Sequence, residues 1–349
     1  MTKAKKVMLF IFELLLIMVV AFLCVVACVA FKTERNSALE QGFFKARNQE
    51  TILELWHVET FEGGTTSREK YLEKRAIEFE KQNKGVFVLV KSVSLSELEL
   101  SFKENKMPDL ISFGYGVQNQ FKDKLVALNL ENSTFLKQSF YDSGLNGGRL
   151  LAVPYCYSRN LLFSTPEKLE KAGVNGSETL NNILFNAGYT IKTKKKTKVV
   201  YSCVYGGQNT PNLMLESAVQ NAILPESATL SSFNAYLKFY GGGATILLGS
   251  LRDLARLENK LKSGEITKLL CEPYSNETSL TQNLGVFASS SSEKQRFSTM
   301  FIDYCLSPFA QAQVAGVGLL SPTQNIYSQN SALGQIEKQS QNITAAPLF

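Results

Sequence analysis

The polar and apolar positions after residue 50 follow the two periods of regular secondary structure. Residues 52–57 alternate between apolar and polar side chains, which predicts a strand, and residues 68–83 place apolar side chains at helical spacing. The pattern then predicts a strand over 86–90, a helix over 95–103 and a strand over 108–113. Strands and helices that alternate at these intervals predict a parallel sheet with helices on its faces.

A second series of elements begins near residue 148. One strand leads through Pro154 into a second apolar strand that ends at Phe163. The later pattern predicts strands over 193–204 and 244–250, and helices over 166–172, 212–222, 230–239, 251–262 and 294–306. The chain has 349 residues, more than one average domain, so we expect two α/β units.

The N-terminal residues favour attachment to a membrane. Lysines at positions 3, 5 and 6 precede an apolar run over residues 7–31 that one charge, Glu13, interrupts. This run exceeds the roughly 20 apolar residues that a bilayer-spanning helix needs. Lysines before the run favour a cytoplasmic N-terminus and an external body. We therefore expect a signal or membrane anchor over 1–31 and a polar stalk over 32–50.

A possible lipid attachment site lies inside the same run. Val25, Val26 and Ala27 precede Cys28, and this order fits the bacterial lipobox, in which the cysteine becomes lipid-modified. The alternative is a cysteine that falls by chance in a membrane helix. Either route attaches the body to the extracytoplasmic face of the cell membrane.

Composition excludes several classes of function. The net charge of +6 is mild, and the densest basic run, over residues 192–198, lacks the interleaved aromatics of a nucleic-acid site. Hydrophobic residues make up 44% of the chain, which indicates folded cores rather than disorder. The six cysteines show no spacing typical of zinc ligands. We expect no metal, no cofactor and no nucleic-acid partner.

The sequence also argues against an enzyme. His57 is the only histidine, and no GxSxG, Walker A or HExxH motif is present. A lone histidine at a strand end is more typical of a hydrogen-bonded packing residue than of a catalytic base. A glycosidase built on paired carboxylates would carry none of these motifs, so this alternative stays open. We expect a binding protein with no catalytic residues.

Five segments of the body, in this order, resemble the bacterial extracellular solute-binding proteins that serve sugar-type ABC importers. No single segment is diagnostic, but the order of the five is specific, and together they span about residues 52 to 323. They are residues 55–57 through Gly63 and Gly64, residues 108–113, residues 151–155, residue 244 through Arg252 and Asp253, and residues 292–295 through 303–308.

The resemblance implies an α/β, two-lobed periplasmic-binding-protein-like fold of type II after the N-terminal membrane segment. Lobe one would comprise 52–153 plus about 280–320, and lobe two 154–279 plus 321–349. Such a protein closes on a small polar ligand, often a carbohydrate, and delivers it to an ABC transporter permease. Two features depart from the family: the second lobe is short, and Trp56 is the only tryptophan available for stacking on a sugar.

Candidate ligand-binding residues follow the predicted strand ends, where open α/β sheets bind ligands. Backbone N–H groups in the first loop are suited to holding a polar oxygen or an anion, although the loop also fits an ordinary turn with Thr65 or Thr66 capping the helix. The candidates are Glu59, Glu62, Gly63 and Gly64 in that loop, Tyr115 after the third strand, Tyr157 and Ser158 at the crossover, and Ser250 and Arg252 after the strand over 244–250.

Two of these assignments have specific alternatives. Strand alternation sends Tyr155 and Tyr157 to one face and Cys156 and Ser158 to the other, so one pair is expected to line the cleft. Arg252 offers a bidentate grip on a carboxylate or phosphate, or a salt bridge to Asp253 or Glu258 along its own helix. If the protein is a receptor, Glu62, Tyr157 and Arg252 converge on one ligand.

Two other functional classes are compatible with the sequence. The long anchor and short second lobe suit a two-lobed sensory or scaffold module without a transported ligand. Four Asn-X-Ser/Thr triplets would suit a eukaryotic type II membrane glycoprotein, although such triplets also arise by chance. The triplets begin at Asn132, Asn175, Asn276 and Asn342.

Overall fold

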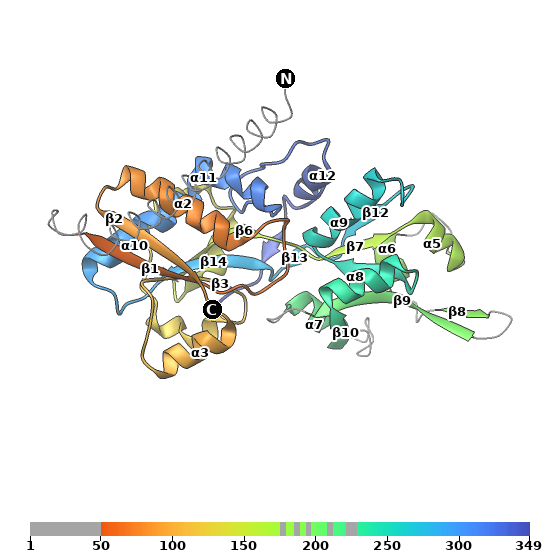
Figure 1. Cartoon of the computed structure of the whole chain (residues 1–349), viewed down its shortest axis with the longest axis horizontal. Coiled ribbons are helices and arrows are strands. Elements are labelled where there is room, and N and C mark those ends of the chain that lie inside the picture. Colours follow the sequence, from red (N-terminus) through yellow and green to blue (C-terminus); the bar gives the residue numbers. More distant parts are fainter. Residues whose placement is uncertain (1–49, 175–178, 185–188, 193–196, 208–211, 221–228) are drawn as a thin grey trace, which may run out of the picture. The chain divides into compact units, whose positions relative to one another are not determined.

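The computed structural model describes residues 50–174, 179–184, 189–192, 197–207, 212–220 and 229–349 (Figure 1). The expected anchor, nearly all of the stalk and Cys28 lie outside these residues. Within the described part of the chain, no helix combines the length and the apolar character that crossing a membrane requires.

The first lobe is built on a five-stranded mixed sheet. Its strand order is β2-β1-β3-β14-β6, in which β1 and β3 are parallel and β14 is antiparallel to both of its neighbours. The sequence pattern had not predicted β14 as a strand, because its buried positions include the polar side chains of Gln282 and Asn283. The strands are β1 Thr51–His57, β2 Val86–Ser92, β3 Leu110–Gly114, β6 Ala152–Tyr157 and β14 Thr281–Val286.

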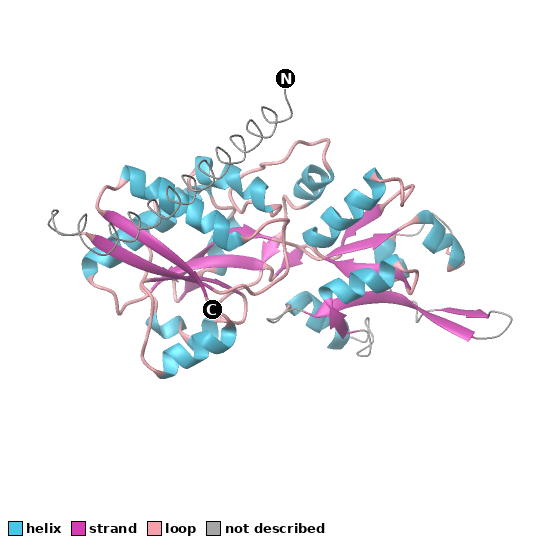
Figure 2. Cartoon of the chain, viewed as in Figure 1, coloured by secondary structure: helices cyan, strands magenta, loops and turns pink. Residues whose placement is uncertain are grey.

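Helices cover both faces of this sheet (Figure 2). On one face α2, Arg68–Gln82, packs on α10, Ser292–Leu306, with the rings of Phe79 and Phe301 edge to face at 5.4 Å. On the other face α3, Leu95–Lys103, buries Leu98 in a cluster with Trp56 and Ile111. The shorter elements are α4 Gln138–Ser143, β4 Leu145–Asn146, β5 Arg149–Leu150 and α11 Pro308–Ala312.

The second lobe is built on a sheet of order β10-β9-β11-β7-β12. Strands β10, β9 and β11 are parallel, and β7 is antiparallel to both β11 and β12. Where one strand was expected over 193–204, the structure has two antiparallel strands, β8 and β9, and residues 193–196 between them lie outside the described residues. The strands are β7 Leu161–Ser164, β8 Tyr189–Lys192, β9 Thr197–Gly207, β10 Thr229–Ser231, β11 Ala244–Gly249 and β12 Leu270–Pro273.

Within its described residues the second lobe has five helices, and two of them follow strand ends. Helix α8, Ser232–Tyr240, follows β10, and helix α9, Leu251–Lys262, follows β11. Each begins at a serine whose hydroxyl accepts a hydrogen bond from a backbone N–H of the first turn. The other three are α5 Pro166–Lys171, α6 Leu180–Ile183 and α7 Leu213–Gln220.

The C-terminal residues contact segments of both expected lobes. Residues 321–349 were expected in lobe two, but Leu348 is buried with Trp56 and Ile111 of the first lobe, and its N–H donates to the Ser143 carbonyl at 2.9 Å. The segment contains α12 Ala332–Gln339 and β15 Thr344–Ala345, and β15 pairs with β13 Glu277–Thr278. The boundary expected at residues 153 and 154 falls inside β6.

A buried arginine holds the chain where it crosses between the sheets. The side chain of Arg159, between β6 and β7, is fully buried, and it donates to Ser340 Oγ at 2.7 Å and to the carbonyls of Gln339 at 3.2 Å and Ser275 at 2.5 Å. No carboxylate of the described residues forms a salt bridge with it, so neutral oxygens alone solvate this charge.

We expect Arg159→Ala to lower the free energy of unfolding by about 3 kcal/mol, because hydrogen bonds to charged groups contribute about 1.5–3 kcal/mol each and their carbonyl partners would be left unpaired. Urea unfolding of both proteins measures this. Arg149→Ala, at an exposed arginine, is the matched control and should change stability by less than about 0.5 kcal/mol. Equal effects of the two substitutions would contradict the role given to Arg159.

Candidate ligand site between the two sheets

The loop after β1 is held by the backbone of residues 316 and 317. Thr65 N–H donates to the Val317 carbonyl at 2.6 Å, and Thr66 Oγ1 donates to the Gly316 carbonyl at 2.9 Å. Gly64 has φ +75°, and a Cβ there would collide with the Val317 carbonyl, so only glycine fits. Ser67 caps α2 in place of the expected Thr65 or Thr66. The Thr65 N–H is therefore occupied within the protein.

The opposing part of the site follows β11 in the second lobe. Ser250 caps α9 and forms a capping box with Asp253, whose carboxylate accepts from the Ser250 N–H at 3.0 Å. Arg252 lies in the first turn of α9, and Arg256 lies one turn further along. The sequence pattern had singled out Ser250 and Arg252 but not Arg256.

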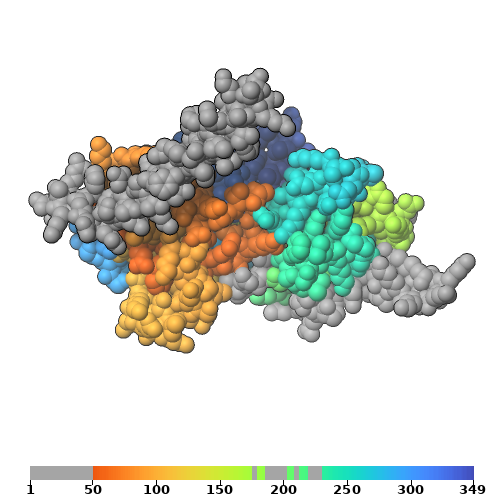
Figure 3. Space-filling model, in the orientation of Figure 1, coloured from red at the N-terminus to blue at the C-terminus, as the bar shows by residue number. Residues whose placement is uncertain are grey.

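Two arginines of α9 contact the first-lobe loop directly. Arg252 Nη1 donates to the Gly64 carbonyl at 2.9 Å, and Arg256 Nη2 pairs with the Glu62 carboxylate. Figure 3 shows the corresponding surfaces, red-orange and green-blue, adjoining one another. Among the described residues, Arg252 has no salt bridge to Asp253 or Glu258. The structure thus brings together Glu62, Gly64 and Arg252 of the predicted set.

Arg256 is held on three sides. Its Nη1 donates to Asp253 at 2.9 Å, and its guanidinium lies over the rings of Phe233 at 5.2 Å and Tyr236 at 5.5 Å. Burial opposes the charge, but the bonds to Glu62 and Asp253 outweigh it and raise the pKa of Arg256. Burial also raises the pKa of Asp253. The guanidinium is therefore fixed in position and permanently charged.

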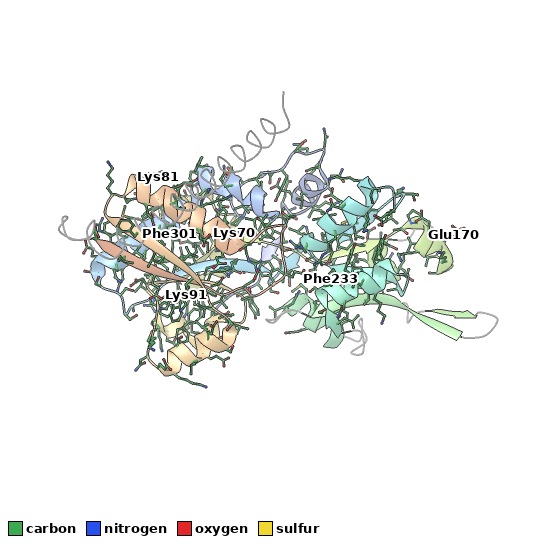
Figure 4. The ribbon with its side chains drawn as sticks, viewed as in Figure 1. Lys70, Lys81, Lys91, Glu170, Phe233 and Phe301 are labelled. Carbon is green, nitrogen blue, oxygen red and sulfur yellow. The ribbon has the colours of Figure 1, made fainter. Side chains whose placement is uncertain are left out.

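Helix α8 adds aromatic surface that sequence analysis missed. The Phe233 and Tyr236 rings are stacked at 6.2 Å, and those of Tyr236 and Tyr240 at 6.1 Å. Phe233 is 50% exposed, and Figure 4 labels it on α8. Trp56, the only tryptophan of the chain, is buried. The aromatic spacing within residues 230–239 was the signal that could have identified this surface.

A small cavity of about 10 Å³ lies at the carboxyl ends of β9 and β11. Gly206 and Gly249 line it from the strands, Ser232 and Ser250 from the helix starts, and Asn160 from the crossover. The volume matches about one water molecule. This is the edge at which open α/β sheets bind ligands, and its lining is mostly polar.

The structure places the four crossover residues inside the fold. One pair was expected to line the cleft, but Tyr155, Cys156, Tyr157 and Ser158 are all buried. Tyr155 stacks on the Tyr71 ring at 5.8 Å, and Tyr157 packs on the ring of Phe140 at 4.6 Å. Both faces of β6 are covered, so alternation cannot expose either pair. As ligand contacts, Tyr157 and Ser158 stay predictions.

The remaining candidates lie beside the site rather than in it. Glu59 forms a salt bridge of 3.2 Å with Arg68, whose guanidinium is buried over the Phe61 ring at 4.3 Å. Tyr115 is half-buried against the cluster that contains Phe113. Gly63 contacts Phe61 closely, so a larger residue there would displace that ring. As ligand contacts, these residues stay predictions.

A buried polar network crosses the first sheet beneath the loop. His57 Nδ1 and Ser112 Oγ are 2.9 Å apart, Gln282 Nε2 donates to Ser112 Oγ at 3.0 Å, and Thr60 Oγ1 donates to Gln282 at 3.3 Å. Tyr155 OH completes it, 3.2 Å from Ser112 Oγ. Burial, with a smaller contribution from Arg68, lowers the pKa of His57 to about 3. The imidazole is therefore neutral near pH 7.

The described residues contain no group of three or more His, Cys, Asp or Glu side chains placed to hold a metal ion. Cys156, Cys203 and Cys305 are buried and Cys271 is half-buried, all as free thiols. Among the triplets noted in the sequence, Asn132 uses its amide nitrogen to bond Asp303, and that nitrogen is the atom a glycan would need.

Comparison with solved structures identifies the fold. The GacH receptor of Streptomyces glaucescens, solved without ligand and with acarbose, superposes with a TM-score of 0.57 at 16% identity over 86% of this chain and 89% of its own. The sugar-binding protein MalE of Xanthomonas citri superposes with a TM-score of 0.58 at 16% identity over 85% and 87%. The chain has the two-lobed fold of these binding proteins. The fold prediction is confirmed.

A third structure agrees. The maltose/maltodextrin-binding domain MalE of Bdellovibrio bacteriovorus, bound to maltotriose, superposes with a TM-score of 0.52 at 13% identity over 85% of this chain and 89% of its own. No protein-family model matches the sequence, and no curated protein matches it. The similarity to these proteins is therefore one of backbone structure and not of sequence.

The neutral His57 predicts a specific loss of stability in acid. Its folded-state pKa of about 3 lies below the ordinary 6.5, so its contribution is complete above pH 6.5 and is lost as pH falls toward 3. Between pH 6.5 and 4.5 the free energy of unfolding should fall by about 2 kcal/mol more in the wild type than in His57→Gln. Urea titrations at both pH values measure the difference, and parallel losses would contradict it.

Proposed function

We propose that this protein is an extracytoplasmic solute-binding protein that captures a small polar ligand, of carbohydrate type, between its two lobes for import by an ABC transporter. The observation that carries the proposal is the direct contact of Arg252 and Arg256 with the loop at Glu62 and Gly64, at strand ends of both sheets. A binding protein that closes on a polar ligand needs polar groups from both lobes at the strand ends that face each other.

The chemistry of the site supports a hydroxyl-rich ligand. Arg252 donates to a neutral carbonyl, an acceptor that a ligand oxygen can replace without leaving a buried charge unpaired. Half-exposed Phe233 offers an apolar ring of the kind that stacks on the C–H face of a sugar. The similar proteins described above include complexes with acarbose and maltotriose. Neutral oligosaccharides are therefore the first ligands to test.

Extracytoplasmic attachment is part of the proposal. It rests on the lysine-flanked apolar run over residues 7–31 and on the lipobox pattern that ends at Cys28. A body held at the outer face of the membrane would meet its ligand next to the permease. Both a retained helix and a lipid anchor satisfy this requirement.

One observation favours the second candidate, a two-lobed sensory or scaffold module without a transported ligand. The first-lobe loop is already bonded on both sides by the protein itself, to Val317 and to Arg252. Such a module needs a fixed arrangement of its lobes rather than an exchangeable ligand. Binding measurements separate the two candidates, because only the receptor gains stability from a saccharide.

We expect calorimetry with a panel of neutral oligosaccharides to identify a ligand whose affinity falls about tenfold to a hundredfold in Arg252→Ala, since one lost polar partner in a desolvated site costs about 1–3 kcal/mol. Phe233→Ala should weaken the same ligand through lost stacking. Arg149→Ala, at an exposed arginine of the first lobe, is the control and should bind like the wild type. Unchanged affinity in both site variants would overturn the assignment of the site.

Metabolic labelling with a fatty-acid analogue tests the lipid anchor. If Cys28 is lipidated, Cys28→Ser should lose the label, whereas Cys24→Ser, in the same apolar run, should keep it. Protease added to intact cells should digest the body of the wild type. A body resistant to protease until the cells are lysed would be incompatible with an extracytoplasmic position.

A further inference from the structure

A second hollow lies on the first lobe and shares no residue with the site between the sheets. Its volume is about 560 Å³, within the usual range for small-molecule sites. Three separate segments enclose it: the C-terminal end of α2, residues 129–132, and the second half of α10. Nothing in the proposed function uses it.

The walls of this hollow are fixed by their own hydrogen bonds. The Asp303 carboxylate accepts from Asn132 N at 2.7 Å and from Asn132 Nδ2 at 2.9 Å, which joins the loop to α10. Tyr304 OH donates to Glu78 at 2.8 Å, so its ring stands between α10 and α2. Asn83 Nδ2 donates to the Phe79 carbonyl at 3.0 Å and closes the end of α2. The shape therefore exists before any ligand binds.

The groups that face the hollow are acceptors, amides and apolar surface. Gln82, Asn129 and Glu131 are exposed, and no hydrogen bond is recorded for their side chains within the described part of the chain. Met300, 38% exposed, and the half-buried Tyr304 supply apolar contact area. Among the described residues that line it there is no lysine or arginine, the side chains that bind phosphates and carboxylates most strongly.

We propose that this hollow is a second binding site, for a neutral saccharide. Amide and carboxylate oxygens accept from sugar hydroxyls, amide N–H groups donate to them, and a thioether and an aromatic ring contact the C–H face. The acidic groups exclude anionic sugars by charge repulsion. The inference is independent of ligand capture between the lobes, because the two sites share no residue.

Hydroxyl-radical footprinting of the full chain tests this site locally. Met300 and Tyr304 report on the hollow, whereas Phe233 reports on the site between the sheets. With maltotriose as the probe, oxidation of Met300 and Tyr304 should fall to a saturable limit, and glucuronate should give no protection. Protection of Phe233 alone would overturn the second site while supporting the proposed function. Protection of Met300 and Tyr304 alone would support the second site and would show that maltotriose is not captured between the lobes.

A blocking variant adds a control. Asn129→Trp should fill the hollow. The maltotriose concentration that gives half-maximal protection of Met300 should then rise about tenfold, the equivalent of about 1.4 kcal/mol in binding free energy. Asn342→Trp places the same ring at an exposed asparagine outside the hollow and should leave the protection unchanged. Equal protection in both variants, or equal protection of the wild type by glycerol, would show that no specific site exists.

Discussion

The left-handed backbone of Gly64 is the constraint on which the site between the sheets depends. Its conformation and its close approach to the Val317 carbonyl exclude any side chain at this position. The same turn lets the Gly64 carbonyl accept from Arg252, while the next N–H donates to Val317. One peptide segment thus bonds to its own lobe through a donor and to the opposite lobe through an acceptor.

The two arginines of α9 have different electrostatic environments. Arg256 is neutralised by Glu62 and Asp253 and covered by aromatic rings, so its position is fixed by several partners at once. Arg252 has a single recorded acceptor, a backbone carbonyl. Replacing the hydrogen-bond partner of Arg252 therefore costs less free energy than replacing the partners of Arg256. Arg252 is also the arginine that the sequence identified, because it follows a predicted strand.

The sequence predicted the features that depend on the local pattern of residues. It did not predict those that depend on which distant segments pack against a residue. Glu62, Gly64 and Arg252 were identified because each follows a predicted strand, and open α/β sheets bind ligands at their strand ends. Arg256 looks like any helix-surface arginine until the opposing loop is placed beside it. The burial of Tyr157 could not be predicted from alternation, because alternation assumes one exposed face, whereas all residues of β6 are buried. The hydrophobic pattern alone did not indicate β14, because Gln282 and Asn283 are polar yet buried, and only the family resemblance implies a crossover near residues 280–285.

The segment that ends at Leu320 connects the loop to the crossover. Val317 accepts from Thr65, and Leu320, three residues later, exchanges two backbone hydrogen bonds of 2.9 Å with Tyr157 on β6. A five-residue stretch, 316–320, is therefore bonded at one end to the loop after β1 and at the other to the strand that leads into the second lobe. All of these bonds lie within the first lobe, so they tie the position of that loop to the start of the crossover through main-chain atoms alone. A displacement of the loop would therefore reach the crossover strand without the participation of any side chain.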